Sequence, residues 1–215
     1  MKNLWIIGLL AALSVSGCKS AYYGAMEKVG IDKREIMVDR VLGARKAQDE
    51  AKETIKTTLE QFSAVVEIKS GDLEKTYNKF NALFKETEAD VNEVHSRIAS
   101  IESVSGALFK EWKAEIKTYT NAELRKQSEA QLKASQARYE QMIKAMKTAS
   151  AQMDPVLASF RDQVLFLKHN LNSAAISSIQ GEVVKIKGDV SRLIADMDKA
   201  IAEADAFIKA WQNPN

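Results

Sequence analysis

The sequence predicts an all-α protein, an elongated antiparallel four-helix bundle with coiled-coil-like packing and up-down-up-down order. The chain is rich in Ala, Glu, Lys and Gln and has only two prolines, a composition typical of long helices. Its apolar residues also recur at alternating steps of three and four, the spacing that places them on one helix face. We expect one bundle domain at 32–212, with helices at about 33–69, 73–118, 121–169 and 174–211.

The first helix is predicted to begin after an N-cap at Asp32, because Glu35 follows three residues later and an apolar stripe starts beyond it. Small residues in the middle of this stripe would let a neighbouring helix approach closely. The stripe consists of Val38, Val41, Ala44, Gln48, Ala51, Ile55, Leu59, Phe62 and Val66.

A turn at Ser70-Gly71-Asp72 is predicted to end the first helix, with Asp72 as the N-cap of the second. The next stripe is an almost unbroken heptad pattern, which predicts a helix of roughly 70 Å and left-handed supercoiling against its neighbours. Gly106 is the expected place for a bend. The stripe consists of Leu73, Tyr77, Phe80, Phe84, Thr87, Val91, Val94, Ile98, Ile101, Ser105, Leu108 and Trp112.

The third helix is predicted to follow a tight turn at 119–121, where Thr120 and Glu123 have the spacing of a capping box. Pro155 lies inside its stripe, and the heptad phase continues through it, so we expect a kink rather than a break. The stripe consists of Leu124, Ser128, Leu132, Ser135, Tyr139, Met142, Met146, Ala149, Met153, Val156, Phe160, Val164, Leu167 and Leu171.

The last turn is predicted at 170–173, before a fourth helix. The start of that helix has two interpretations, because Ser177 and Gln180 offer a second cap. Its stripe consists of Ile176, Ile179, Val183, Ile186, Val190, Leu193, Met197, Ile201, Ala204, Ile208 and Trp211.

The predicted helix lengths place both chain termini and the 119–121 turn at one end of the bundle, with the other two turns at the far end. Tyr22, Tyr23 and Tyr119 would gather near the terminal end with Trp112 and Trp211, where amphipathic aromatic residues suit a lipid interface. We favour the alternative for the two tryptophans, that they are heptad core residues. Likewise, Met142, Met146 and Met153 are interpreted as core rather than as an adaptable binding surface.

Residues 1–17 have the pattern of a secretory signal peptide, with Lys2 before an uncharged apolar run and small residues. The run is slightly shorter than the ~20 apolar residues of a transmembrane helix, so a retained anchor is the weaker interpretation. It ends at Val15-Ser16-Gly17-Cys18, which resembles the lipobox of bacterial lipoproteins. The resemblance implies that Cys18 becomes the mature N-terminus and carries a diacylglycerol thioether, with a further acyl chain such as palmitate. Residues 18–31 would then form a lipidated tether.

The stretches YYGAMEKVGIDKR, from Tyr22 to Arg34, and FRDQVLFLKHNLN, from Phe160 to Asn172, are similar to a family of Gram-negative bacterial lipoproteins. That family is known only as a domain of unknown function with coiled-coil character, and the resemblance covers essentially the whole mature chain. It implies an envelope protein and brings no catalytic residue, cofactor or substrate. By resemblance to sorted lipoproteins, Lys19 after the cysteine implies the inner leaflet of the outer membrane, facing the periplasm.

The composition argues against several function classes. The 31 Lys and Arg residues nearly balance the 29 Asp and Glu residues, which is not the clustered basic face that nucleic acid requires. The only histidines, His95 and His169, lack a second ligand at metal-binding spacing and are interpreted as surface residues. Glycine-rich phosphate loops and nucleophile elbows are not found in the sequence. We therefore expect no enzyme activity, no cofactor and no metal.

The most unusual segment lies near the end of the third helix, where residues 164–167 are apolar around the whole helix. We favour the interpretation that neighbouring helices enclose this segment. The alternative is that its outer residues meet another protein. The candidate partner surface would then consist of Leu165, Phe166, Lys168, His169 and Asn170.

These observations predict a lipid-anchored periplasmic scaffold or interaction protein of the bacterial envelope. Its expected contacts are the membrane, through the N-terminal lipid, and an envelope protein that the sequence does not identify. Association with a second copy is also open, because long heptad surfaces often pair with themselves. The alternative function is a helical carrier bundle that binds a lipid or acyl chain.

Overall fold

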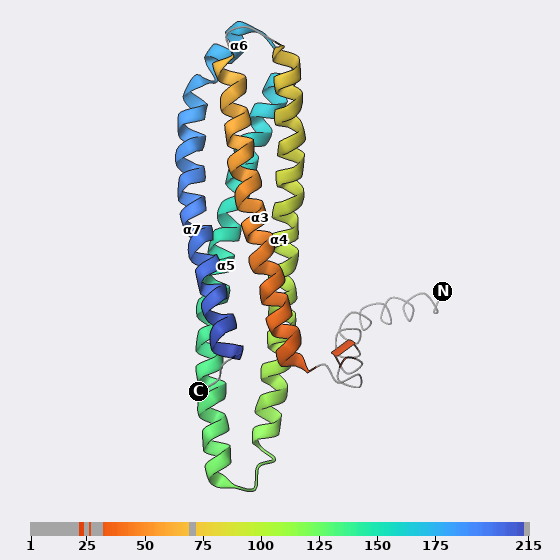
Figure 1. Ribbon diagram of the computed structural model, residues 1–215, viewed down its shortest axis with the longest axis vertical. Helices are drawn as coiled ribbons and strands as arrows, with labels where there is room; N and C mark the ends of the chain where they lie inside the picture. The colour runs from red at the N-terminus through yellow and green to blue at the C-terminus, as the bar shows by residue number, and fades with distance from the viewer. Residues whose placement is uncertain (1–21, 24–25, 27–31, 69–71, 213–215) are drawn as a thin grey trace, which may run out of the picture.

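Long α-helices dominate the computed structural model, which describes residues 22–23, 26, 32–68 and 72–212 (Figure 1). Over these residues the regular structure is entirely helical, which confirms the all-α prediction. The elements are α3 (Lys33–Glu67), α4 (Leu73–Ile116), α5 (Ala122–His169), α6 (Ser173–Ser178) and α7 (Gln180–Gln212). The predicted signal peptide, Cys18 and the turn residues Ser70 and Gly71 lie outside the described residues.

Two of the predicted N-caps are confirmed. The Oδ1 atom of Asp32 accepts hydrogen bonds from the backbone N–H groups of Arg34 and Glu35, at 2.6 and 3.0 Å. Asp72 Oδ1 accepts from the backbone N–H of Lys75 at 2.9 Å. Each carboxylate satisfies N–H groups that have no partner in the first turn of a helix, which is why α3 and α4 begin where they do.

The predicted capping box of Thr120 and Glu123 is wrong. Asn121 is the N-cap of α5, and its Oδ1 atom accepts from the backbone N–H groups of Glu123 and Leu124, at 2.9 and 3.1 Å. Asn is as good an N-cap as Ser or Thr. With Asn121 in this role the helix begins at Ala122, and Thr120 belongs to the preceding turn.

The predicted fourth helix is divided in two. Asn172 caps the short helix α6 through a hydrogen bond from Ala175 N to its Oδ1, 3.0 Å long. The helix ends at Ser178, and the backbone of the next residue, Ile179, leaves the helical conformation while its side chain stays buried. Gly181, a poor helix former, follows the break. The long helix α7 begins at Gln180, and Ser177 lies inside α6, so the alternative cap at Ser177 is wrong.

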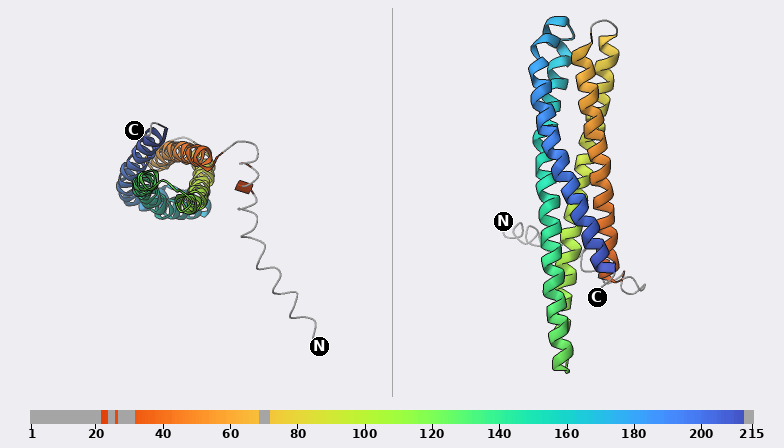
Figure 2. Two further views of the ribbon diagram at one scale, coloured as in Figure 1. Left: turned by 90° about the horizontal axis from the view of Figure 1, so that it is seen from below. Right: turned by 60° about the vertical axis from the view of Figure 1, so that its left-hand side comes forward.

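Each long helix contacts two others along its length: α3 contacts α4 and α7, and α5 contacts the same two helices. Seen from below, the four long helices are arranged around a common axis (Figure 2). Their inward stripes form the core, and Met142, Met146 and Met153 are fully buried in it, which confirms their interpretation as core residues.

Helices α4 and α5 extend beyond the start of α3 and the end of α7 at the end that carries both termini of the four-helix region (Figures 1 and 2). An ion pair from Lys33 Nζ to Glu111 Oε2, 2.8 Å long, shows where α3 begins alongside α4. We call the part of α4 and α5 beyond this level, with the turn at 117–121, the hairpin end. Both helices are unbroken, α4 through Gly106 and α5 through Pro155.

Candidate functional site

The predicted partner surface lies in the last turns of α5, at the end opposite the hairpin end. Leu165 and Phe166 are 55% and 39% exposed, whereas their neighbours Val164 and Leu167 are buried. The favoured interpretation, that neighbouring helices enclose the whole segment, is therefore wrong for Leu165 and Phe166. The ring of α3, α4, α5 and α7 covers the inward face of α5 and leaves its outward face to solvent.

The polar members of this surface are Lys168, His169 and Asn170. Lys168 and His169 are exposed, and Asn170 is half-buried. Asn170 ends the helix, because its backbone N–H donates to Leu167 O at 3.2 Å and its Nδ2 donates to Phe166 O at 2.9 Å. These bonds satisfy carbonyls at the helix C-terminus and hold the last turn in one geometry. We call Leu165, Phe166, Lys168, His169 and Asn170 the distal surface.

Buried side chains of the neighbouring helices support the distal surface from the core side. The hydroxyl of Tyr77, on α4, donates to the carbonyl of Val164 at 3.4 Å, and burial raises the pKa of this phenol above its ordinary value. Near the same end, the ring of Phe80 is 5.2 Å from that of Phe62 and 6.2 Å from that of Phe160. Aromatic contacts of this kind stabilise the packing of three helices behind the distal surface.

Val184 is an exposed apolar residue that the sequence analysis missed. It lies near the start of α7 and is 74% exposed. Its neighbour Val183 was placed in the apolar stripe and is half-buried against the core. The only sequence signal was two adjacent valines, of which a helix can direct one inward.

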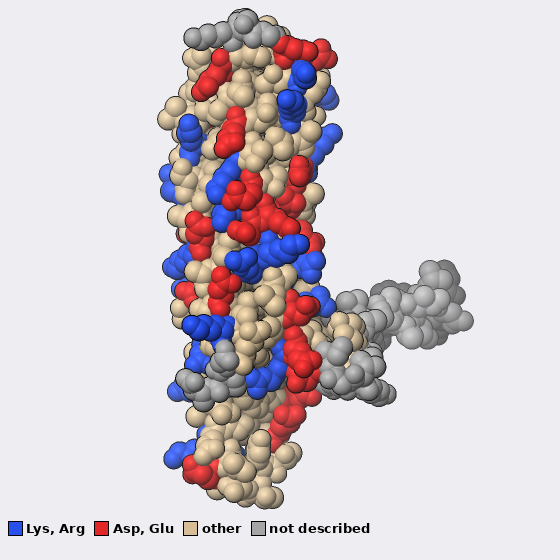
Figure 3. Space-filling view, viewed as in Figure 1, with Lys and Arg blue, Asp and Glu red and all other residues tan. Residues whose placement is uncertain are grey.

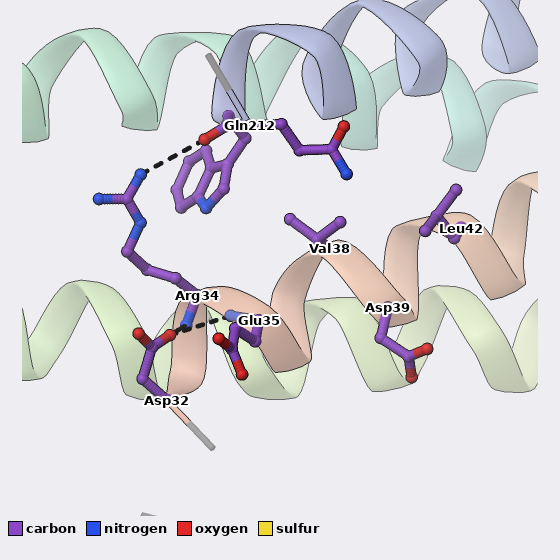
Figure 4. A pocket seen from close by; sticks show the side chains of 8 residues that line it. Asp32, Arg34, Glu35, Val38, Asp39, Leu42 and Gln212 are labelled. Atoms are coloured by element: carbon purple, nitrogen blue, oxygen red, sulfur yellow. Dashed lines mark hydrogen bonds between the residues drawn. The ribbon is translucent and has the colours of Figure 1, made fainter. Parts of the chain in front are cut away.

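A hollow of about 380 Å³ lies at the other end, between the start of α3 and the end of α7 (Figure 4). Arg34 reaches across it: Nη2 donates to the carbonyl of Trp211 at 3.4 Å, and its guanidinium carbon lies 5.5 Å from the indole centroid. Trp211 is buried, which confirms it as a core residue, but its indole N–H has no partner. The lining residues are Asp32, Arg34, Glu35, Val38, Asp39, Leu42, Trp211 and Gln212.

A second hollow, of about 480 Å³, lies where α3 begins above the hairpin end. The Lys33–Glu111 ion pair lies at its edge. Trp112 is half-buried there, and its Nε1 donates to Ser128 Oγ at 2.9 Å. Trp112 therefore packs against the core through its ring, in line with the favoured interpretation, and its polar atom has a partner within the hairpin end.

His95 is half-buried between α4 and α5. Its Nδ1 lies 3.2 Å from Ser150 Oγ, and its Nε2 lies 3.3 Å from Asp154 Oδ1. In the part of the chain that the structure describes, no group of three or more His, Cys, Asp or Glu side chains is placed to hold a metal ion. None of the helices described there is both long and apolar enough to cross a bilayer. Acidic and basic side chains are mixed over much of the visible face, and acidic side chains follow one another along its lower right side (Figure 3).

The family model described as "Protein of unknown function (DUF2959)" matches residues 22–211. The chain belongs to the DUF2959 family. This confirms the resemblance to an uncharacterised family that the sequence indicated. The DUF2959 match includes α3 to α6, the distal surface and all of α7 except Gln212, and it begins at Tyr22, before the first long helix. No curated protein matches the sequence.

Proposed function

We propose that this DUF2959 protein is a lipid-anchored helical scaffold of the bacterial envelope, without a catalytic step. The support for the anchor is the apolar leader and the lipobox-like Val15-Ser16-Gly17-Cys18. Two or three acyl chains on Cys18 would hold the protein stably, because each buried methylene contributes ~0.8 kcal/mol. Lys19 supports the inner leaflet of the outer membrane, so the helices would face the periplasm.

The proposed scaffold is an up-down-up-down bundle with coiled-coil-like packing. Its support is the ring of neighbour contacts among α3, α4, α5 and α7 and the long heptad stripes that supply their buried faces. Such a bundle is stiff over the length of α5, which has 48 residues and spans about 72 Å at 1.5 Å per residue. A stiff rod with a lipid near one end can present a binding surface far from its anchor.

The observation that carries the docking proposal is the exposure of Leu165 and Phe166 beside Lys168 and His169. Most exposed residues of these helices are charged or polar, whereas here a large aliphatic and an aromatic side chain adjoin in one turn. Aromatic anchors with a polar rim are typical of protein interfaces. An envelope protein is the partner we propose for the distal surface.

The test is in-cell photo-crosslinking with a photoreactive amino acid at Phe166 and at Lys168 in the full-length chain, followed by mass spectrometry. We expect one recurrent envelope protein from both positions. The matched control is Leu124, which is 49% exposed but lies at the hairpin end. The same adducts from Leu124 would contradict docking at the distal surface. Crosslinks found only between copies of the chain would mean that the distal surface binds a second copy and not another envelope protein.

The anchor is tested separately by mass spectrometry of the Cys18 peptide from the membrane fraction and by Cys18→Ala. We expect an acylated peptide in the unsubstituted protein and an unprocessed precursor in the variant. A free thiol at Cys18 in mature protein would contradict the anchor. Lipid that co-purifies with the soluble helical part, without any crosslinked protein, would instead favour the acyl-chain carrier.

A further inference from the structure

The two hollows near the start of α3 adjoin each other. Both are lined by Asp32 and Arg34, so they meet at the first turn of this helix. The first hollow continues along α3 to Leu42, and the second continues along α4 to Tyr119 in the turn that follows it. They therefore form one continuous depression on the surface, which we call the acidic groove.

The groove has exposed apolar side chains at both of its ends. Leu42 is 45% exposed in the first hollow, and Tyr119 is 41% exposed in the second. Between them, Val38 and Trp112 are half-buried and pack against the core. Apolar and aromatic side chains that line a surface hollow are typical of a binding site for another molecule.

The carboxylates of Glu35, Asp39 and Glu115 give the groove its charge. All three are exposed and line the hollows, and none of them forms an ion pair within the described part of the chain. Glu35 and Asp39 point away from α7, whereas Val38 and Leu42 point toward it (Figure 4). An apolar strip with unpaired negative charges along one edge is the result.

The groove also holds two cations of its own chain. Lys33 Nζ pairs with Glu111 Oε2 at 2.8 Å, and the guanidinium of Arg34 lies over the ring of Trp211, 5.5 Å from its centroid. Arg34 is exposed, and its hydrogen bond to the carbonyl of Trp211 is long, at 3.4 Å. Such a bond is weak. Arg34 can therefore turn aside and leave the indole to another cation, for which an aromatic face is favourable.

Charge decides which class of molecule fits the groove. Nucleic acid and the anionic headgroups of a membrane are negative, so the unpaired carboxylates repel both. Among the described side chains, no group of three His, Cys, Asp or Glu is placed to bind a metal ion. A basic peptide segment satisfies both features of the groove, because it supplies cations for the carboxylates and aliphatic side chains for Leu42 and Tyr119.

The length of the groove is that of a short peptide. The Lys33–Glu111 ion pair places the start of α3 level with Glu111 of α4. From there α3 covers about 14 Å to Leu42, and α4 covers about 7 Å to Ile116 in the opposite direction, at 1.5 Å per residue. A groove of about 20 Å accommodates about six residues of an extended chain.

We propose that the acidic groove binds a basic segment of a partner protein, in which arginine side chains alternate with aliphatic ones. A guanidinium of the segment replaces Arg34 over Trp211, and its other cations pair with the three carboxylates. The aliphatic side chains lie against Leu42 and Tyr119. This docking surface lies at the opposite end of the four-helix region from the distal surface and does not depend on acylation of Cys18.

The test is fluorescence anisotropy of a labelled peptide with the full-length protein in a non-ionic detergent. The peptide has about six residues, with arginine and leucine in alternation. We expect saturable binding that is lost when glutamate replaces arginine and weakened when serine replaces leucine. Glu35→Gln, Asp39→Asn and Glu115→Gln combined should weaken binding by about tenfold, because each exposed ion pair changes the affinity by a few-fold at most.

The matched control combines Glu60→Gln, Glu86→Gln and Asp162→Asn. These residues are exposed and acidic but do not line either hollow, so the control loses the same net charge. It should bind the peptide as the unsubstituted protein does. An equal loss of affinity in the groove variant and the control would show a general attraction of charge and would overturn the proposal.

Two further variants test the apolar ends and the indole. Leu42→Ser combined with Tyr119→Ser should weaken binding, because the leucines of the peptide lose their contacts. Arg34→Ala should strengthen binding several-fold, since it uncovers the ring of Trp211 and removes a competing cation. Lys126→Ala is its control, because Lys126 is an exposed cation that does not line the groove, and it should change the affinity little.

A peptide with a photoreactive benzophenone locates the site. We expect adducts, identified by mass spectrometry, within residues 32–42 or 108–119. Adducts only at the distal surface, or an affinity that no groove variant changes, overturns the proposal. Unchanged thermal unfolding of the variants excludes loss of fold as the cause of weaker binding. Sedimentation of the protein alone tests a second copy as occupant, and self-association that the groove variants abolish would overturn the basic segment as the ligand.

Discussion

The hydroxyl oxygens of Thr58 and Thr87 lie 2.7 Å apart between α3 and α4, and both side chains are fully buried. Thr87 Oγ1 also donates to the carbonyl of Leu83 at 2.9 Å, so Thr58 is the donor in the shared bond. Buried hydroxyls are stable in a core only when each has a partner. This chain of hydrogen bonds pairs one position of α3 with one position of α4.

Thr87→Val should destabilise the protein by about 1–3 kcal/mol, because it leaves the buried hydroxyl of Thr58 without its acceptor. Thr58→Val combined with Thr87→Val should recover part of the loss, since both polar groups are then replaced by apolar ones. Urea unfolding of both single variants and the double variant measures the coupling. Strictly additive effects would show that the two hydroxyls act independently.

Gln48→Met should stabilise the protein by about 1–3 kcal/mol. Gln48 is fully buried in α3, and neither its Oε1 nor its Nε2 has a hydrogen-bond partner. Methionine has a similar length and leaves no amide to desolvate. Gln61→Met is the control, because Gln61 Nε2 donates to Thr76 O at 3.2 Å and its loss should not stabilise. A lower thermal midpoint for Gln48→Met would mean that its amide is satisfied in solution.

Pro155→Ala should raise the free energy of unfolding by about 1–2 kcal/mol. Proline has no N–H for the carbonyl of Ala151 one turn earlier, yet α5 continues through it. Both residues are exposed, so water can solvate this carbonyl and the cost stays below that of a buried proline. Thermal unfolding measures the change, with Ser159→Ala as a neighbouring control on the same helix. An unchanged thermal midpoint would show that Pro155 does not lower the stability of the protein.

The ion pairs of Lys52 should make the free energy of unfolding depend on pH. Its Nζ lies 2.9 Å from Asp49 Oδ1 and 3.1 Å from Asp198 Oδ1, which joins α3 to α7. The hydrogen bond from Lys52 lowers the pKa of Asp49, and the same bond raises the pKa of Lys52. The Asp49 carboxyl, whose pKa is lowered, contributes stability above its ordinary pKa of 3.8. This stability is lost as the pH falls through the lower pKa of the folded protein. The Lys52 amine, whose pKa is raised, contributes stability below its ordinary pKa of 10.5. This stability is lost as the pH rises through the higher pKa of the folded protein.

Lys52→Met should therefore lower stability by about 0.2–1 kcal/mol near neutral pH, where both charges are present and the carboxylates are largely solvated. The difference from the unsubstituted protein should shrink as the pH falls below 3.8 and as it rises above 10.5, the ordinary pKa values of the two groups. Denaturant unfolding at several pH values measures it. A difference that is constant with pH would mean that Lys52 acts through its aliphatic stem alone.

Local signals explain why the helix starts could be predicted at Asp32 and Asp72. A capping carboxylate interacts with N–H groups two or three residues away, so its effect is contained in the sequence nearby. At 120–121 two neighbouring residues could both act as caps, and the choice of Asn121 was not resolved by spacing alone. The break at Ile179 was not predicted, because it depends on which neighbours bury Ile176 and Ile179.

The sequence by itself determined the helical class, the inward stripes and the burial of the three methionines, because heptad phase is a local property of a helix. Only the tertiary structure decided that Leu165 and Phe166 face solvent and that Tyr23 is buried against Ser103. Exposure depends on which distant segments cover a residue. A tyrosine before the first long helix carries no periodic signal, and the groove that buries it is formed by α4 side chains 80 residues later in the chain.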